Sequence, residues 1–396
     1  MVTKIKPATA PFLTDEMLAR FDERAPVYDR ENRFFDEDLE ELRDSGYLGI
    51  AIPLEFGGPG LTLAEVARLQ RRLAYYAPAT AVAVNMHLYW TGVAADLYRA
   101  GDTSLTWLLE EAADGRIFAA GHGEAGNDVP VLLSTTEARR VDGGWEFTGH
   151  KIFGSLSPVW DYLGIHAMDT SDPASPKVVH AFMPRDAEGY RIEETWDTLG
   201  MRATQSHDTI LERAFVPDRL VALVCPPGFA GAGPYHLSVF AWPLIGFASV
   251  YTGIAQRALD LTVESAHKRR SIALTRSLAY HPEVQHAVAE MRMALESIDA
   301  QVERVADDWS NGVDHGIDWP VKIISAKYMA VTKAWQIVDT ALELTGGSGI
   351  FKRSRIEMLF RDARLGRFHP SNSMLAHEVV GKLSLGIDPD EQPRWG

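Results

Sequence analysis

The spacing of apolar side chains changes twice along the chain. In about the first 115 residues it follows a helical period. The run LTLAEVARLQRRLAYYA is an example, with an apolar face formed by Leu63, Val66, Leu69 and Leu73. Thr62 stands directly before this run and Glu65 follows three residues later, which predicts a capping box at the start of a helix.

Short alternating runs replace the helical pattern between Phe118 and about Leu220. GGWEFTGHKIFG places Trp145 and Phe147 on one face of a strand, and turn residues such as Asp142-Gly143-Gly144 separate the runs. This part of the chain is therefore expected to form a β domain.

Helical spacing returns after the linker CPPGFAGAGP, residues 225–234. VKIISAKYMAVTKAWQIVDTALEL carries an apolar stripe and stops at Gly346-Gly347, which suits a helix C-cap. The pattern predicts an α+β multidomain chain with domains at residues 1–116, 117–224 and 235–396.

Composition excludes several classes of protein. The 396 residues carry a net charge of −15, which argues against binding nucleic acid as the main function. Cys225 is the single cysteine, so neither an intrachain disulfide nor a Cys-rich metal site is expected, and no metal is predicted. No signal peptide and no run of about 18 apolar residues is recognised, so we expect a cytoplasmic protein without a membrane span.

Four segments, in this order, resemble the acyl-CoA dehydrogenase superfamily: IPLEFGGPGLTLAEVARL, TLGMRATQSHDTILERAFVPDRLV, HPEVQHAVAEM and TALELTGGSGIFKRSRIEMLFRDAR. The resemblance covers nearly the whole chain. It implies an N-terminal helical domain, a central β-barrel-like domain and a C-terminal four-helix bundle. It also implies FAD as the cofactor, bound between the β domain and the C-terminal helices.

The resemblance assigns residues to the flavin ring. Phe153 matches the aromatic residue that covers the isoalloxazine, and Ser155 matches the hydroxyl at its polar edge. Gly121 and His122 fall in the loop that follows the flavin, where the superfamily usually has Thr-Glu. Asn127 matches a position that often contacts a thioester substrate. An ordinary strand core and rim remain the alternative reading of Phe153 and Ser155.

The same resemblance implies a site for the FAD pyrophosphate that a second subunit completes, and hence a homodimer or homotetramer. Arg270 matches the pairing arginine, with Arg269 as a rival, and Gly346 and Gly347 match a turn where the backbone approaches the phosphates. A solvated charge run is the alternative for the two arginines, and a simple helix stop is the alternative for the two glycines.

The glutamate that serves as catalytic base in most of the superfamily is missing. RDARLGRFHPSN aligns His369 with the Tyr, Pro370 with the Glu, Ser371 with the Gly and Asn372 with the Thr of the usual Tyr-Glu-Gly-Thr stretch, so Asn372 is expected at the cofactor. A second location of the base aligns with Pro243 or its neighbours. His369 is the first candidate replacement because imidazole titrates near neutral pH, and its loss should then cut turnover at least about 100-fold. Other candidates for a relocated base are His87, His377 and Glu378.

Three functions are left open. The first is α,β-dehydrogenation of an acyl thioester by a non-standard base, with an electron-transfer flavoprotein or O2 as acceptor. The second is monooxygenation through a flavin C4a-(hydro)peroxide, a chemistry of a superfamily branch that lacks the glutamate, with His87 and Tyr89 near the substrate. The third is a degenerate flavoprotein scaffold. For His369 and His87 a purely structural role is the competing reading, and Ser371 or Asn372 could simply cap the next helix.

Overall fold

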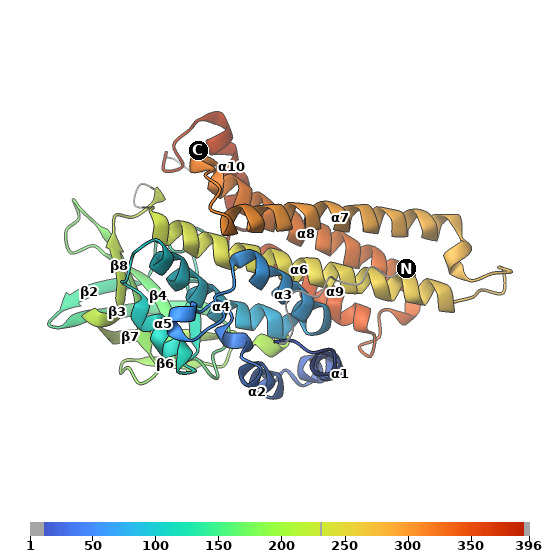
Figure 1. Cartoon of the computed structure of the whole chain (residues 1–396), viewed down its shortest axis with the longest axis horizontal. Helices are drawn as coiled ribbons and strands as arrows, with labels where there is room; N and C mark the ends of the chain where they lie inside the picture. Colours follow the sequence, from blue (N-terminus) through green and yellow to red (C-terminus); the bar gives the residue numbers. More distant parts are fainter. Residues whose placement is uncertain (1–11, 230–231, 392–396) are drawn as a thin grey trace.

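The computed structural model describes residues 12–229 and 232–391, and its elements follow the order helices, sheet, helices (Figure 1). The helices before the sheet are α1 Asp15–Glu31, α2 Asp36–Asp44, α3 Leu63–Tyr76, α4 Pro78–Arg99 and α5 Thr106–Ala113. The predicted capping box at the start of α3 is confirmed, because Thr62 Oγ1 accepts from the Glu65 N–H and the Glu65 carboxylate accepts from the Thr62 N–H.

The middle of the chain forms an eight-stranded mixed sheet. Its strands are β1 Phe118–Gly121, β2 Glu137–Val141, β3 Gly144–Gly154, β4 Tyr162–Asp169, β5 Lys177–Pro184, β6 Tyr190–Glu193, β7 His207–Pro217 and β8 Val221–Cys225. The hydrogen-bonded order is β6-β7-β3-β2-β4-β5-β8, and β1 pairs in parallel with β4. Trp145 and Phe147 of β3 are both buried, as their alternation predicts.

The sheet of the expected β-barrel-like domain is not closed. In the described part of the chain β6 and β8 pair on one side only, so they are the two edges of an open sheet. A closed barrel needs its first and last strands to exchange hydrogen bonds. Alternation along each strand is the same in both arrangements, so the sequence could not distinguish them.

The helices after the sheet are α6 Pro234–Lys268, α7 Pro282–Ser310, α8 Trp319–Thr345, α9 Arg355–Leu365 and α10 Ser373–Leu385. Figure 1 shows α6, α7 and α8 side by side with the shorter α9, as the expected bundle requires, while α10 lies at the other end of α8. By length and composition α6 alone, among the described helices, passes a test for a membrane span, but 83% of its most apolar window is buried inside the protein. A buried core helix explains that composition, and the cytoplasmic location stays a prediction.

The first helices pack directly on the last ones. Helix α6 contacts α3, α4 and α8, and one continuous apolar core runs through all three regions. Gly92 allows the close approach of α4 to α6, because a Cβ atom there would lie 2.2 Å from the Trp242 ring. The secondary structure changes between Ala113 and Phe118 and again between Cys225 and Pro234. The boundaries 1–116, 117–224 and 235–396 lie at these changes and stay predictions.

Candidate active site

An exposed aromatic ring stands at the end of β3, where the flavin is expected. Phe153 is 57% exposed and has φ of +61°, a backbone conformation that residues other than glycine seldom adopt. The register of β3 against β7 shifts between Lys151 and Gly154, and this irregularity places the ring at the surface, edge-on to Trp196. An apolar ring held outward in this way leaves one face for a flat ligand.

Beside Phe153, three hydroxyl groups form a short chain. Ser155 Oγ lies 2.7 Å from Ser206 Oγ, which lies 2.7 Å from Thr204 Oγ1. Thr204 Oγ1 donates to the Met201 carbonyl, and the Met201 N–H donates to Asp362 of α9 at 2.6 Å. The predicted ring-edge hydroxyl is therefore tied through the segment before β7 to the helix that precedes His369.

The loop after β1 is organised by a carboxylate that the sequence reading missed. Glu124 is buried and accepts hydrogen bonds from Lys151 Nζ at 2.6 Å, from Ser134 Oγ at 2.6 Å and from the backbone N–H groups of Thr135 and Thr136. Burial alone would raise the pKa of this carboxyl, but Lys151 and the hydroxyl donors outweigh it and lower the pKa to about 2. A charged Glu124 therefore fixes the loop.

The side chain of Asn127, which was expected to contact the substrate, instead forms hydrogen bonds within this loop. Its Nδ2 donates to Glu124 at 2.8 Å and to the Leu133 carbonyl at 2.7 Å, and its Oδ1 accepts from the Val129 N–H. These bonds use both the donor and the acceptor of the amide. A substrate contact through Asn127 stays a prediction that the geometry does not favour.

Tyr89 and His122 lie together in the interior. Tyr89 Oη is 2.9 Å from His122 Nε2, and His122 Nδ1 is 3.1 Å from His166 Nδ1. Burial lowers the pKa of His122 to about 3, so the ring is neutral. At Gly121, the neighbour of His122, even a Cβ atom would be crowded, because side-chain atoms of Leu163 and Ile165 lie 3.2–3.3 Å from its position.

His87 has no free ring nitrogen. Nε2 donates to the Leu48 carbonyl at 3.0 Å, and Nδ1 accepts from the Phe118 N–H at 3.1 Å. The side chain is buried, and burial lowers its pKa to about 4. The structural reading of His87 fits this geometry better than the catalytic one, since both nitrogens hold the backbone that leads into β1.

His369 is packed between two residues of α6. Its ring stacks on Phe247 with 4.1 Å between centroids, and its Nε2 lies 2.9 Å from Tyr251 Oη. Burial, and then the nearby Lys327 charge, lower the pKa of His369 to about 3. An imidazole with so low a pKa is a weak base at neutral pH.

Lys327 of α8, another residue that the sequence reading missed, holds the loop of His369. The buried Nζ donates to the carbonyls of His369 at 3.1 Å and of Ser371 at 3.2 Å. Burial lowers the pKa of Lys327 to about 7. Asn372 then caps α10, because its Oδ1 accepts from the N–H groups of Met374 and Leu375. The capping alternative is thus confirmed for Asn372, and its expected contact with the cofactor stays a prediction.

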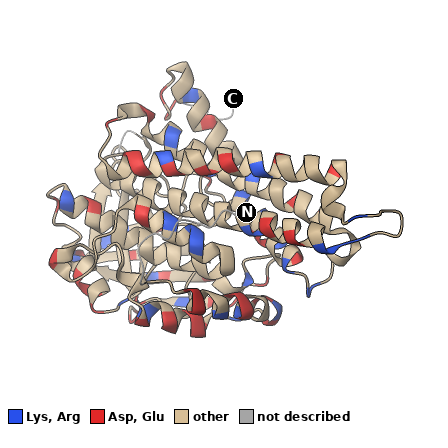
Figure 2. Ribbon diagram, turned by 45° about the vertical axis from the view of Figure 1, so that its right-hand side comes forward, with Lys and Arg blue, Asp and Glu red and all other residues tan. Residues whose placement is uncertain are grey.

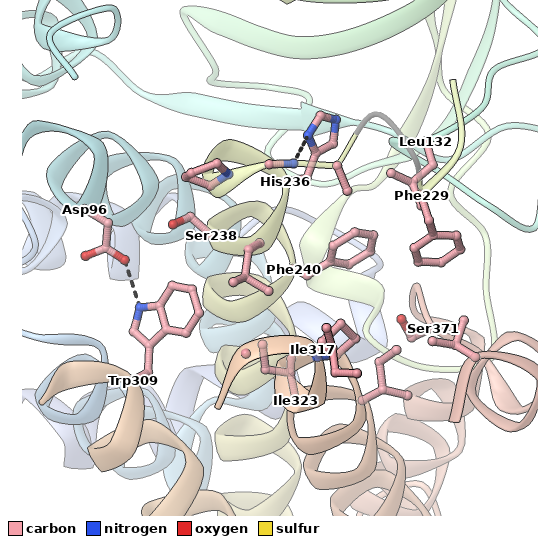
Figure 3. A pocket seen from close by; sticks show the side chains of 18 of the residues that line it. Asp96, Leu132, Phe229, His236, Ser238, Phe240, Trp309, Ile317, Ile323 and Ser371 are labelled. Atoms are coloured by element: carbon pink, nitrogen blue, oxygen red, sulfur yellow. Dashed lines mark hydrogen bonds between the residues drawn. The ribbon is translucent and has the colours of Figure 1, made fainter. Parts of the chain in front are cut away.

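A cavity of about 1340 Å³ opens beside this loop (Figure 3). Helices α4, α6, α8 and α10 and the connection after β1 supply its walls, and Ser371 joins it to the His369 loop. Its apolar lining includes Leu132, Phe229, Leu237, Phe240, Ile317, Ile323, Leu375 and Val379. None of the residues that the sequence assigned to the site lines it. Leu63, which helical spacing assigned to an apolar face, also lines this cavity, so the spacing alone does not distinguish a packed core from a cavity wall.

The polar groups of the cavity are few. Asp96 Oδ2 accepts from Trp242 Nε1 at 2.7 Å and from Trp309 Nε1 at 2.9 Å, and burial raises the pKa of this carboxyl. His236 and Ser238 lie on the first turns of α6, and Figure 3 shows the His236 ring on the side of the cavity nearest the strands. The cavity suits a ligand with an apolar body and a small polar group.

Basic residues gather at the opposite end of the molecule. Figure 2 shows Lys and Arg at the connection between α6 and α7, where the sequence has Lys268, Arg269, Arg270 and Arg276. Arg269 Nη1 donates to the Leu344 carbonyl at 2.6 Å, and its guanidinium lies against Gly346, which has φ of +64°. Arg270 is exposed, and Gly347 has open space at its Cβ position. Arg269 thus lies beside the Gly-Gly turn, and the role of Arg270 at the pyrophosphate stays a prediction.

Three family models together cover most of the chain. They are the N-terminal, middle and C-terminal domains of acyl-CoA dehydrogenase, matched by residues 5–105, 118–214 and 245–374. The chain belongs to the acyl-CoA dehydrogenase superfamily. The expected family and fold are therefore confirmed, and superfamily members are flavoprotein oxidoreductases, so FAD is the expected cofactor.

The relatives of this superfamily protein fall into more than one reaction class. Bacillus subtilis YdbM, named as an acyl-CoA dehydrogenase, is 27% identical, and the match covers 92% of each chain. The L-evernosamine nitrososynthase of a Micromonospora strain is 26% identical over 94% of this chain and 89% of its own. The structure of KijD3 with FMN and a dTDP-linked amino sugar superposes with a TM-score of 0.84, at 24% identity and over 99% and 98% of the two chains.

The residues of the flavoprotein site fit a flavin ring and its phosphates at separate places. Phe153 offers the exposed face, and Ser155 the hydroxyl at the ring edge. Arg270 and the Gly346-Gly347 turn offer a cation and open backbone. Helix α6 has 35 residues and a length of roughly 50 Å, and Arg270 follows its C-terminal end, whereas Phe153 lies on β3 of the sheet.

Proposed function

We propose that this protein is a FAD-dependent monooxygenase that oxidises a small molecule held in the cavity beside Ser371. The observation that carries the proposal is the environment of His369. Neither expected position of the base holds an acid: one is Pro370, and the other is Pro243 or its neighbours in FAWPLIG. The imidazole next to Pro370 has a pKa of about 3 and bonds to Tyr251. An abstraction of a substrate α-proton lacks a competent base there.

Bound FAD supplies the redox chemistry and the reaction with O2. The chain's own residues then have three tasks. Phe153 and Ser155 orient the ring, the Tyr251–His369 pair presents neutral hydrogen-bonding groups near the loop, and the apolar cavity excludes water from the reacting centre. Neutral donors suit an oxygen atom that gains charge, whereas a carboxylate would repel it.

The nitrososynthase relative supports an oxygenase, because its name states the synthesis of a nitroso group. The cavity is lined mainly by apolar side chains with few polar groups, as small-ligand pockets usually are. This lining supports a substrate with an aliphatic or aromatic body and one polar group. The shape of the cavity, and no sequence motif, selects the substrate.

Dehydrogenation of an acyl thioester is the second candidate. YdbM, which matches at 27% identity over 92% of both chains, is named for this activity. The reaction would need a base from outside the two proline positions, and it would pass electrons to an electron-transfer flavoprotein or to O2. This candidate is favoured because dehydrogenation is the commonest activity expected in the superfamily.

We further propose a homodimer or homotetramer in which Arg270 and the Gly346-Gly347 turn of one subunit bind the FAD whose ring lies on Phe153 of another. The placement of Phe153 on β3 and of Arg270 after the C-terminal end of α6, on elements far apart in the chain, supports this arrangement.

One experiment separates the two reactions. The flavin-loaded protein is mixed anaerobically with a panel of acyl-CoA thioesters, and the flavin absorbance is followed. An oxygenase leaves the flavin oxidised, and the chemically reduced protein then consumes O2 through a transient whose spectrum differs from both stable flavin states. Bleaching by any thioester would instead establish dehydrogenation.

A further inference from the structure

Three metal-ligating side chains converge where the sheet meets the first turn of α6. His180 lies on β5, Cys225 ends β8, and His236 lies on α6. One ligand atom from each residue lies within 4.8 Å of the other two, and all three side chains are buried. None of them belongs to the flavin site or to the His369 loop.

The strand register explains how two of the ligands meet. Strands β5 and β8 pair antiparallel with Val178 opposite Cys225, and His180 is two residues along β5 from Val178. Residues two apart on a strand share a face, so His180 and Cys225 are diagonal neighbours on one side of the sheet. His236 follows Cys225 by eleven residues and reaches the same place from the helix.

His180 itself points to a missing ligand. It is 1% exposed, and neither ring nitrogen has a hydrogen-bond partner among the described residues. The rings of Tyr235 and His236 meet it edge-on at 5.3 and 5.2 Å between centroids, and the ring of His166 stacks on it at 6.0 Å. Buried polar groups without a partner cost free energy and are rare in folded proteins. A cation would satisfy one of these nitrogens.

The separation of the other two ligand atoms also suits a metal. Cys225 Sγ lies 3.7 Å from His236 Nε2. Metal–sulfur and metal–nitrogen bonds of about 2.3 and 2.0 Å at a tetrahedral zinc place the two atoms roughly 3.5 Å apart. His236 Nδ1 makes a long 3.4 Å contact with the Gly233 N–H. Coordination through Nε2 puts the ring proton on Nδ1, so this contact must open.

We propose that His180, Cys225 and His236 bind one Zn²⁺ ion per chain, with a fourth coordination position available to water or to a Lewis-basic atom. Two imidazoles and one thiolate form a borderline-soft ligand set of the kind zinc prefers. His236 also lines the cavity, so the ion lies in the cavity wall and links the sheet to α6. The Cys225 thiol loses its proton to solvent when the sulfur–metal bond forms.

Cobalt replaces zinc in such sites and reports on sulfur directly. The flavin-loaded protein is stripped with a chelator, dialysed, and titrated with CoCl2 and, separately, with ZnCl2 under calorimetry. The expected result is one ion per chain, with cobalt d–d bands to the red of the flavin absorption and a thiolate-to-cobalt charge-transfer band. Because Cys225 is the single cysteine of the chain, this band identifies its ligand without any substitution.

Matched variants then test the ligand set. Cys225→Ser and His180→Ala should each weaken zinc binding by at least about 100-fold, more than the loss of an outer-shell partner. His150→Ala is the control, because His150 is an exposed histidine paired with Asp208 on the sheet and should leave binding unchanged. Retained flavin and an unchanged circular dichroism spectrum show that a variant is folded.

Two results would overturn the proposal. One is the absence of stoichiometric binding, or of the charge-transfer band, in the wild-type protein. The other is an unchanged zinc affinity in folded Cys225→Ser protein. Both are independent of the reaction at the flavin, so the failure of the oxygenase proposal would leave this test intact.

Discussion

Tyr251 Oη and His369 Nε2 lie 2.9 Å apart, and His369 directly precedes Pro370, the residue that aligns with the expected position of the catalytic glutamate. Phe247, one turn before Tyr251 on α6, stacks on a face of the imidazole, whereas Tyr251 contacts the ring edge. The pair is therefore a neutral, packed hydrogen-bonding unit. Its chemistry is that of a positioned donor and acceptor rather than that of a base.

His369→Gln tests this reading. Glutamine keeps a hydrogen-bond partner for Tyr251 but cannot serve as a base, so we expect turnover to fall by less than about tenfold, with FAD still bound. A fall in turnover of about 100-fold or more is the effect expected when a general base is removed, and it would return His369 to that role. The measurement is the steady-state turnover of whichever substrate the wild-type protein oxidises.

Phe153→Ala should weaken FAD binding by about tenfold, or about 1.4 kcal/mol, because stacking on one aromatic face is lost. Phe215→Ala is a matched control, since Phe215 is also a partly exposed phenylalanine of the sheet but lies on β7 opposite Glu146. Fluorescence titration of the apoprotein with FAD measures both affinities. Equal effects of the two substitutions would remove Phe153 from the cofactor site.

Mixed oligomers test whether two subunits share one FAD. Phe153→Ala and Arg270→Ala should each lower the flavin content of the purified protein. Co-expression of the two variants should restore part of it, because each mixed pair contains one site with both residues intact. Arg269→Ala serves as the comparison, since Arg269 Nη1 is engaged with the Leu344 carbonyl. No recovery in a proven mixed oligomer would mean that both residues serve the same chain.

The buried Lys327 predicts a pH dependence of stability. In the folded protein its pKa is lowered from 10.5 to about 7 by burial, so between these pH values the unfolded chain binds more protons. The contribution of Lys327 to the free energy of unfolding therefore rises as the pH increases from about 7 to 10. Urea unfolding should show wild-type protein gaining stability over this range relative to Lys327→Met.

Lys333→Met is the control for the loss of a lysine from α8, because Lys333 Nζ binds Gln336 on the outer side of the same helix. A constant difference between wild type and Lys327→Met across this pH range would show that Lys327 titrates alike in both states.

Several local features of the fold could be predicted because they depend on neighbours in the sequence. The capping box of Thr62 and Glu65, the buried pair of Trp145 and Phe147, and the helix stop at Gly346 all follow from interactions within a few residues. The superfamily itself was predicted from four segments in order, and the absence of an acid at Pro370 was visible directly.

The roles of individual polar residues could not be predicted in the same way. The Asn127 amide donates to Glu124 of its own loop. Both ring nitrogens of His87 are hydrogen-bonded to the backbone of Leu48 and Phe118. These partners are brought to the two side chains only by the folding of the chain. The open edges of the sheet likewise depend on which strands meet, not on their alternation.

The sequence by itself determined the family, the order of helices and strands, and the loss of the usual base. Tertiary structure decided the charge state of His369, the loop anchored by Lys327, and the meeting of His180, Cys225 and His236. The reason is physical: a pKa and a ligand set depend on the groups that surround an atom in space, and these groups come from elements far apart in the chain.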